Sequence, residues 1–206
     1  VSGDNLVEIG PGLAALTRPL LERAGHLTAI EIDRDLARRL GSEFPPGQLT
    51  LHVADALDFD FASLGPALRI VGNLPYNISS PLLFHLAAHD ALLTDLHVML
   101  QKEVVARMTA APATADYGRL TVMLQAKFRI ARLFVVPPGA FRPAPKVESA
   151  VARLVPLHAD KPAIGSAVEL SQSVVGLSSS TLYHWRLRVA GNSPLFPHSQ
   201  WLFPPD

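Results

Sequence analysis

The stretch LVEIGPGLAALTRPLLERA, residues 6–24, combines three features that decide the fold class. LVEIG (6–10) is a short apolar run that predicts a strand, Gly10-Pro11-Gly12 predicts a tight turn, and residues 13–24 have helical periodicity. Residues 10–15 fit the G-x-G-x-x-A form of a nucleotide-binding turn, in which glycine lets the backbone approach a ligand and the free N–H groups of the helix face it. A purely structural turn between strand and helix also favours glycine, so the motif alone leaves both interpretations open.

The alternation of strands and helices continues along the chain. Strands that alternate with helices of about 10–12 residues are typical of βαβ units, which build a parallel sheet covered by helices on both faces. The predicted strands are residues 6–10, 26–33, 49–55, 68–73 and 96–101, followed by a terminal pair at 128–136 and 149–157. The predicted helices are residues 13–24, 34–44, 79–90, 102–110 and 118–126, and the third of them has a Ser cap and Pro81 in its first turn.

The composition limits the class of protein. The 206 residues, 49% of them hydrophobic, suffice for one ordinary domain and an appendage. The absence of cysteine excludes disulfides, thiolate metal sites and cysteine nucleophiles, and it fits a reducing cytoplasm. No apolar run approaches the roughly 20 residues of a membrane span, and the first residues are not typical of a signal peptide. We therefore expect a soluble, cytoplasmic protein.

The net charge of zero conceals an uneven distribution. Residues 1–100 carry 6 Lys and Arg against 12 Asp and Glu, whereas residues 101–161 carry 10 against 4. The acidic first part suits a cationic or hydroxyl-rich ligand, and the basic second part suits an anionic partner such as nucleic acid. Solvated faces would explain the charges equally well, so the asymmetry matters only where it coincides with a site.

Four features fall at the carboxyl ends of predicted strands, the edge at which open α/β sheets bind ligands. They are Gly10-Pro11-Gly12, Glu31, Asp55 and Asn73-Leu74-Pro75-Tyr76. Glu31 follows Gly12 by 19 residues, close to the interval of about 20 at which an acid binds ribose hydroxyls, although it could also be a charged strand end. Asp55 can accept a hydrogen bond from an exocyclic amine, although a turn residue is the simpler interpretation of Asp55 alone. The coincidence of all four predicts a ligand site.

Two cofactors fit this arrangement. A dinucleotide would bind through its pyrophosphate, whereas S-adenosylmethionine has no phosphate and carries a cationic sulfonium and ammonium. Glu8, just before the glycine turn, would repel a phosphate and attract those cations, and the acidic balance of residues 1–100 acts in the same direction. The sequence therefore favours S-adenosylmethionine over NAD.

The segment GNLPYNIS, residues 72–79, supplies groups that suit methylation of an adenine amine. The lone pair of that amine is delocalised into the ring and attacks a methyl group poorly. The Asn73 side-chain oxygen and the Leu74 carbonyl, held extended by Pro75, would accept from the amine N–H groups and favour a pyramidal nitrogen aimed at the sulfonium methyl. Tyr76 offers a ring on which an extruded base can stack. The proton of the product ammonium is acidic and can leave to water without a general base.

Six segments, taken in order, resemble a known family over roughly residues 5–157. They are EIGPGLAALT (8–17), EIDRDL (31–36), NLPYNISSPLLF (73–84), MLQKEVVARM (99–108), YGRLTVM (117–123) and FRPAPKVESAVARL (141–154). The family is the small-subunit (16S) ribosomal RNA dimethyladenosine transferases, the bacterial KsgA type. Asn-Leu-Pro-Tyr alone is shared by many amino-group methyltransferases, whereas the fourth and sixth segments are much more specific.

The resemblance implies a fold and an activity. The fold would be the Rossmann-like α/β fold of class I S-adenosylmethionine-dependent methyltransferases, with a mostly parallel, seven-stranded type of sheet and helices on both faces. The activity would be addition of two methyls to N6 of each of two adjacent adenosines in a hairpin of small-subunit ribosomal RNA. S-adenosylmethionine would be the donor, and the immature small ribosomal subunit the partner, late in ribosome assembly.

The resemblance also implies roles for individual residues. Gly10, Gly12 and their neighbours, with Glu8, would hold the methionine end of the donor, Glu31 its ribose and Asp55 its adenine amine, beside Asn73. Asn73 and Leu74 would bind the target amine, while Tyr76 stacks on the base. Phe141 would close the other face of the base, or else serve as a hydrophobic plug between two strands. The candidate contacts to the RNA backbone are Lys102, Arg107, Arg119, Arg142 and Lys146.

The remaining titratable residues suggest no further chemistry. His52, His85 and His97 lie in apolar periodic segments and are interpreted as packed histidines. No spacing of His, Asp or Glu is typical of a metal site. We therefore predict no metal.

Both ends of the chain differ from the family pattern. Family members begin with a segment that has a Gln-Asn-Phe-Leu-like motif and folds over the donor, and residues 1–158 are expected to form a catalytic domain without that lid. Residues 159–206 do not resemble the family's small basic helical domain, and we interpret them as an atypical tail that is disordered or read from a shifted frame. Two alternative functions stay open: a large-subunit RNA adenine N6-methyltransferase of the macrolide-resistance type, and a non-catalytic RNA-binding assembly or transcription factor.

Overall fold

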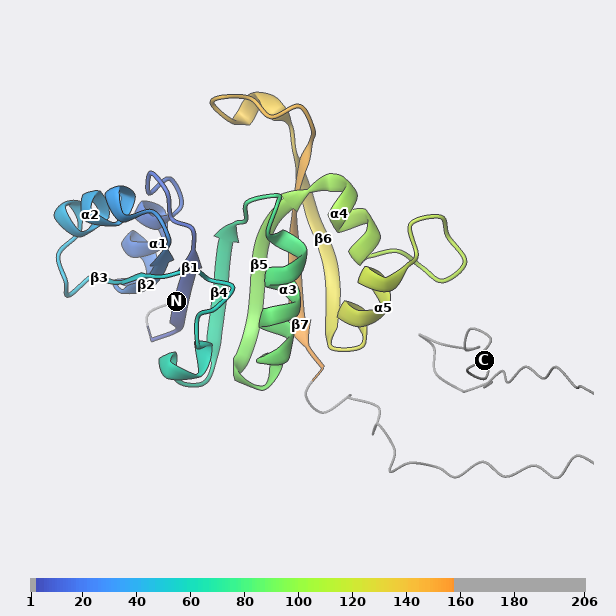
Figure 1. The fold of residues 1–206 in the computed structure, drawn as a ribbon, viewed down its shortest axis with the longest axis horizontal. Helices are drawn as coiled ribbons and strands as arrows, with labels where there is room; N and C mark the ends of the chain where they lie inside the picture. Colours follow the sequence, from blue (N-terminus) through green and yellow to red (C-terminus); the bar gives the residue numbers. More distant parts are fainter. Residues whose placement is uncertain (1–2, 158–206) are drawn as a thin grey trace, which may run out of the picture. The chain divides into compact units, whose positions relative to one another are not determined.

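One sheet of seven strands organises residues 3–157, the part of the chain that the computed structural model describes (Figure 1). The strand order is β3-β2-β1-β4-β5-β7-β6. The pairs β1–β2, β1–β4, β2–β3 and β4–β5 are parallel, whereas β7 runs antiparallel between β5 and β6. The strands are β1 Asn5–Ile9, β2 Leu27–Glu31, β3 Leu49–Val53, β4 Leu68–Asn73, β5 Leu93–Gln101, β6 Phe128–Val136 and β7 Ser149–Pro156. The predicted mostly parallel α/β sheet and its terminal strand pair are confirmed.

Helices cover the two faces of this sheet. They are α1 Thr17–Ala24, α2 Arg34–Glu43, α3 Ser79–Ala88, α4 Lys102–Met108 and α5 Arg119–Gln125. Buried side chains of α1 and α2 pack with β2 and β3 in one apolar cluster, which includes Leu21, Leu40 and Leu27. Side chains of α3, α4 and α5 pack with β4, β5 and β7 in a second, larger cluster. Side chains of β1 and β2 alternate between the two clusters, which explains why these two strands are apolar on both faces.

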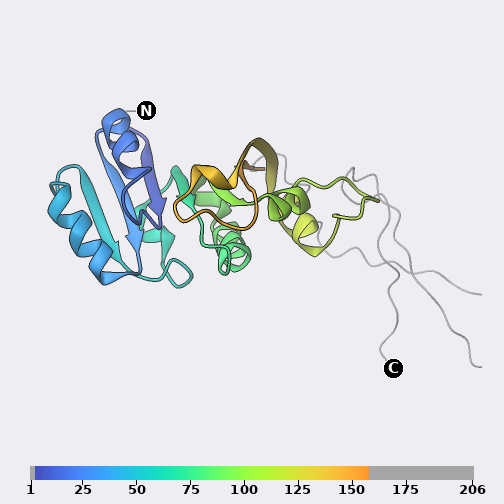
Figure 2. The same ribbon diagram turned by 90° about the horizontal axis from the view of Figure 1, so that it is seen from above.

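The loop between β6 and β7 projects from the end of the sheet at which β4 and β5 finish (Figure 1). Figure 2, seen from above, shows this loop over the middle of residues 3–157 rather than at their outer edge. The loop contains the Pro-rich segment 137–146. Its position brings a distant part of the sequence to the strand ends that were predicted to form the site.

Three sequence predictions about element ends are wrong. The helix predicted at residues 13–24 begins at Thr17, because Gly12 and Ala14 adopt positive φ angles of 56° and 65° that a right-handed helix excludes. The predicted Ser cap of α3 is absent: the Ser79 hydroxyl donates to the Tyr76 carbonyl at 2.8 Å instead of accepting from the helix. The strand predicted from residue 96 begins at Leu93.

Residues 158–206 lie outside the described residues, and so does the predicted tail at 159–206. Within the described part, no helix is long and apolar enough to cross a membrane.

Candidate active site

A cavity of about 240 Å³ opens at the carboxyl ends of β1, β2 and β3. Its walls come from the glycine turn, the segment after β2, the segment after β3 and the loop after β4. The lining residues are Ile9, Gly10, Ile30, Glu31, Ile32, Ala54, Asp55, Ala56, Pro75, Asn77 and Ile78. Ile32 is 64% exposed although it is apolar, so a ligand in this cavity would bury it. Three of the four predicted strand ends therefore line this one cavity, and the fourth contributes its proline.

Hydrogen bonds from the glycine turn to the end of β2 fix its position. Gly10 has a φ of 68° and its N–H donates to the Ile30 carbonyl at 3.0 Å. The N–H of Gly12 donates to the Glu31 carboxylate. Because α1 begins only at Thr17, the N–H groups next to the cavity belong to the turn and not to the end of a helix, contrary to the sequence prediction.

Glu31 joins the ends of two strands. Its side chain is buried, and its Oε2 accepts from Gly12 N–H at 3.1 Å while its Oε1 accepts from Asp33 N–H at 3.0 Å. The Asp33 carboxylate in turn caps α2 by accepting from the N–H groups of Asp35 and Leu36. Each oxygen of Glu31 retains a second lone pair, so the carboxylate can still accept from hydroxyl groups in the cavity.

Asp55 lies in the turn after β3. Its Oδ1 accepts from Leu57 N–H at 2.9 Å, so one oxygen has the turn role that the sequence suggested as the simpler interpretation. No described residue donates to its Oδ2, and Asp55 lines the cavity. The second oxygen is available to accept from an amine there.

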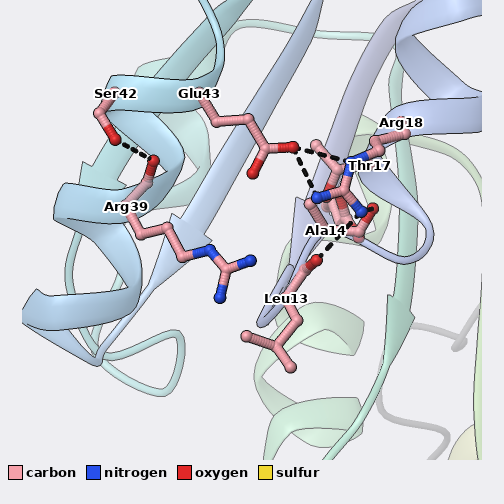
Figure 3. A network of polar contacts seen from close by, with 8 residues as sticks. Leu13, Ala14, Thr17, Arg18, Arg39, Ser42 and Glu43 are labelled. Atoms are coloured by element: carbon pink, nitrogen blue, oxygen red, sulfur yellow. Dashed lines mark hydrogen bonds and ion pairs between the residues drawn. The ribbon is translucent and has the colours of Figure 1, made fainter.

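Arg18 braces the turn between β1 and α1 from outside (Figure 3). Its guanidinium donates to the carbonyls of Leu13 and Ala14 at 3.3 and 3.4 Å. The same side chain pairs with Glu43 at the end of α2 at 2.6 Å. These contacts connect the turn to α2 through side chains that do not line the cavity. No pattern in the sequence predicted them.

Glu8 differs from the sequence prediction in its surroundings. It lies in β1, only 2% exposed, and the Thr17 hydroxyl donates to its Oε2 at 2.7 Å. Burial raises the pKa of the Glu8 carboxyl to about 7, against the opposing effect of the Thr17 hydrogen bond and with a smaller contribution from the charge of Glu31. Glu8 is not among the residues that line the cavity. Its full negative charge is thus not available to the ligand at neutral pH, and a direct contact with the donor stays a prediction.

The segment after β4 is anchored on both sides. The Leu74 side chain is buried and its N–H donates to the Met99 carbonyl at 3.1 Å. The Tyr76 hydroxyl shares a hydrogen bond of 2.8 Å with the buried Ser149 hydroxyl at the start of β7. No described residue donates to the Asn73 side-chain oxygen or to the Leu74 carbonyl. Both oxygens can therefore accept hydrogen bonds from a substrate amine, which is the role that the sequence analysis predicted for them.

A second cavity, of about 310 Å³, opens on this segment. It is lined by Asn73, Leu74, Pro75, Tyr76, Phe141, Pro143 and Pro145. Phe141, about which the sequence left two interpretations open, faces the same cavity as Tyr76, although the two are far apart in the chain. Pro143 and Pro145 were not predicted as site residues, because the sequence of a Pro-rich loop does not indicate which of its residues face a cavity.

The predicted RNA-binding cations lie on α4, on α5 and in the loop between β6 and β7. Lys102 pairs with Glu148 at 2.6 Å, and Lys102 and Lys146 both line a third cavity, which lies between α4 and the loop that follows β6. Arg107 and Arg119 are exposed on α4 and α5, and Arg142 is exposed in the loop after β6. Their contact with RNA stays a prediction.

The three predicted packed histidines have identifiable partners. His52 contacts the Phe59 ring, and His85 Nε2 lies 2.9 Å from the Phe59 carbonyl. His97 is half-buried, and burial lowers its pKa, with Asp95 opposing the shift and Arg153 adding to it. Within residues 3–157 no group of His, Asp or Glu side chains is arranged to hold a metal ion.

Two solved structures with this arrangement are RNA-modifying transferases. A dimethyladenosine transferase from Plasmodium falciparum is 32% identical with a TM-score of 0.64, and the match covers 73% of this chain and 55% of that one. The 23S rRNA methyltransferase ErmE is 31% identical with a TM-score of 0.63, and the match covers 76% and 63% of the two chains. The fold is therefore the Rossmann-like α/β fold of class I methyltransferases.

The sequence relationship is closer still. Residues 2–175 match the model of the family described as ribosomal RNA adenine dimethylase, and the chain belongs to this family. Proteins named ribosomal RNA small subunit methyltransferase A from Aromatoleum aromaticum and Thiobacillus denitrificans are 64% and 62% identical, over 78% and 81% of this chain. The chain spans 61% and 66% of the length of these two curated relatives.

Proposed function

We propose that this chain transfers methyl groups from S-adenosylmethionine to N6 of adenosine in ribosomal RNA. The products would be N6,N6-dimethyladenosines at two adjacent positions of a small-subunit hairpin, made on the immature subunit in the cytoplasm. One observation carries the proposal: Pro75 lines both the first cavity and the second. The segment that binds the target amine is thus the wall between a cavity suited to a donor and a cavity suited to a base.

The first cavity has the groups that an adenosyl donor requires. Apolar side chains of Ile30, Ile32 and Ile78 would enclose the adenine, and Asp55 Oδ2 would accept from its amine. The Glu31 carboxylate, fixed by two backbone N–H groups, would accept from the ribose hydroxyls. Among residues 3–157, no Lys or Arg lines the cavity, which supports S-adenosylmethionine over a dinucleotide without the argument from Glu8.

The second cavity has the groups that activate an adenine amine. S-adenosylmethionine, when bound, supplies a methyl group on a cationic sulfur. The Asn73 side-chain oxygen and the Leu74 carbonyl would accept from the two amine N–H groups, which favours a pyramidal nitrogen and stabilises the positive charge that develops on it. Tyr76 and Phe141 would hold the two faces of the base in place. The proton lost from nitrogen passes to water.

Substitution of Asn73 tests this assignment. Asn73→Ala should lower kcat for methyl transfer to a hairpin RNA by about 100-fold or more, because it removes a contact that strengthens as charge develops. The affinity for RNA, measured by fluorescence anisotropy, should change less than about threefold. The control is Gln48→Ala, which removes an exposed amide whose side chain makes no hydrogen bond within residues 3–157. Equal losses of turnover and of RNA affinity in Asn73→Ala would contradict the role.

A large-subunit substrate is the second candidate, and the similarity to the 23S rRNA methyltransferase ErmE favours it. The full chain should methylate undermethylated small subunits in preference to large-subunit RNA. The reverse preference would favour the second candidate. A non-catalytic RNA-binding factor would bind no labelled donor at millimolar concentration, so equilibrium dialysis with labelled S-adenosylmethionine separates it from both enzymes.

A further inference from the structure

The loop between β6 and β7 lines both the second cavity, which we call the base cavity, and a third cavity of about 560 Å³. Pro145 lines the base cavity and Lys146, the next residue, lines the third one. Consecutive Cα atoms are about 3.8 Å apart, so adjacent residues of one loop contribute to the two cavities. The third cavity is lined by Gln101, Lys102, Glu103, Ala106, Asp116, Lys146, Val147 and Glu148.

Two of the charged side chains of this cavity form an ion pair with each other, and three have no ion-pair or hydrogen-bond partner within residues 3–157. Lys102 and Glu148 pair with each other at 2.6 Å across the cavity wall, and the Lys102 N–H also donates to the Glu148 carbonyl at 2.9 Å. Within residues 3–157, Lys146 has no ion-pair partner, and the carboxylates of Glu103 and Asp116 accept no hydrogen bond. The wall therefore leaves one cation and two acceptors for a ligand.

These free groups match one nucleotide unit of an RNA strand. A cation next to the base cavity suits the phosphate that follows the target base, and carboxylates accept from exocyclic amines of adenine, cytosine or guanine. The volume exceeds that of the base cavity, which suits a base together with its sugar. A strand whose target base enters the second cavity must pass this loop, because the neighbouring nucleotide is covalently attached.

We propose that the third cavity seats the nucleotide next to the target adenosine, with Lys146 at its phosphate and with Glu103 and Asp116 accepting from its exocyclic amine. The inference rests on the proposed function and extends it from the methylated base to the base beside it. The recognition would select substrates whose neighbouring base carries an amine. It would also hold the strand so that the target stays in the base cavity between Tyr76 and Phe141.

The first test changes the neighbouring base and the two acids together. A short synthetic hairpin with two adjacent loop adenosines is compared with one in which the neighbour is purine riboside, which lacks the amine. The full-length wild type should bind the adenosine hairpin about tenfold more tightly by anisotropy. Glu103→Ala/Asp116→Ala should bind both hairpins with equal affinity. The control Glu22→Ala, an exposed acid of α1, should keep the wild-type preference.

A second test addresses the phosphate. Lys146→Ala should weaken binding of both hairpins by a similar factor, about threefold to tenfold, and reduce the slope of log affinity against log salt by about one. Arg23→Ala, an exposed cation of α1, should leave the slope unchanged. A salt slope identical in wild type and Lys146→Ala would overturn the phosphate contact.

The binding measurements keep this inference separate from the proposed function. Absence of methyl transfer to any hairpin by the wild type would reject the proposed function. A preference for the amine-bearing neighbour that survives Glu103→Ala/Asp116→Ala, or no preference in the wild type, would reject the neighbouring-nucleotide cavity even if methyl transfer is normal.

Discussion

The buried carboxyl of Glu8 makes the stability of the protein depend on pH in a predictable direction. Its pKa in the folded protein is about 7, above the ordinary value of 4.5, because burial disfavours the charged form. The folded state therefore holds this proton more tightly than the unfolded state. Its contribution to stability is fully present below pH 4.5, falls between pH 4.5 and 7, and is absent above pH 7.

The magnitude follows from the two pKa values. A difference of roughly 2.5 pKa units corresponds to about 3 kcal/mol, and about 2.5 kcal/mol of it would be lost between pH 5 and pH 8. Glu8→Gln removes the ionisation, while the Gln oxygen can still accept from the Thr17 hydroxyl that bonds Oε2 at 2.7 Å. The variant should therefore match the wild type to within about 1 kcal/mol at pH 5 and exceed it by about 2–3 kcal/mol at pH 8.

Urea unfolding of both full-length proteins at several pH values between 5 and 8 measures this difference. Comparison of the two proteins cancels the titration of the other groups, including His97. An exposed acid provides the control, since Glu22→Gln should give a difference from wild type that does not change with pH. A constant difference between Glu8→Gln and wild type across this range would refute the reasoning.

Two further predictions concern the segment around Asn73. Gly72→Ala should lower the free energy of unfolding by about 1–3 kcal/mol in urea titrations, because a Cβ at this position would lie 2.7 Å from the Ile9 carbonyl oxygen. Gly41→Ala, in α2 with open space around it, should instead raise it by about 0.5–1 kcal/mol, and destabilisation by both would contradict the steric argument. Tyr76→Phe and Ser149→Ala should each raise KM for the hairpin RNA by about fivefold, since each breaks the same 2.8 Å hydrogen bond. The double variant should be no worse than either single variant, and fully additive losses would show that the bond does not position the ring.

The sequence predicted the strand ends because their signals are local. A short apolar run followed by glycine, or by an acid, marks the end of a buried parallel strand whatever the rest of the chain does. The parallel orientation of the first five strands followed from their alternation with helices, whereas their order in the sheet was not predicted. The start of α1 was predicted wrongly because Ala14 adopts a positive φ. Alanine rarely takes this conformation, so the residue type did not indicate it.

The parts of the site that were missed depend on contacts between distant segments. In the sequence, Ser149 is an ordinary first residue of a predicted strand. It reaches Tyr76, 73 positions away, only because β7 lies antiparallel beside β5. Glu8 was predicted as a charge facing the ligand, because sequence shows that a carboxylate precedes the turn but not how deeply the strand is buried. Burial depends on the helices that cover the sheet, and these are settled only by the whole fold.

The close approach of β4 to the end of β1 explains why the two cavities share a wall. Gly72 lies so near the Ile9 carbonyl that no side chain fits between them, and Ile9 is directly followed by the glycine turn. The residue after Gly72 is Asn73, so the small size of one glycine places the amide that would bind the target amine beside the turn that would hold the donor. Leu74 is then buried and bonded to β5, which prevents the segment from moving away. Methyl transfer between two bound molecules requires this fixed, short separation more than it requires any acid or base, because orientation supplies much of the rate.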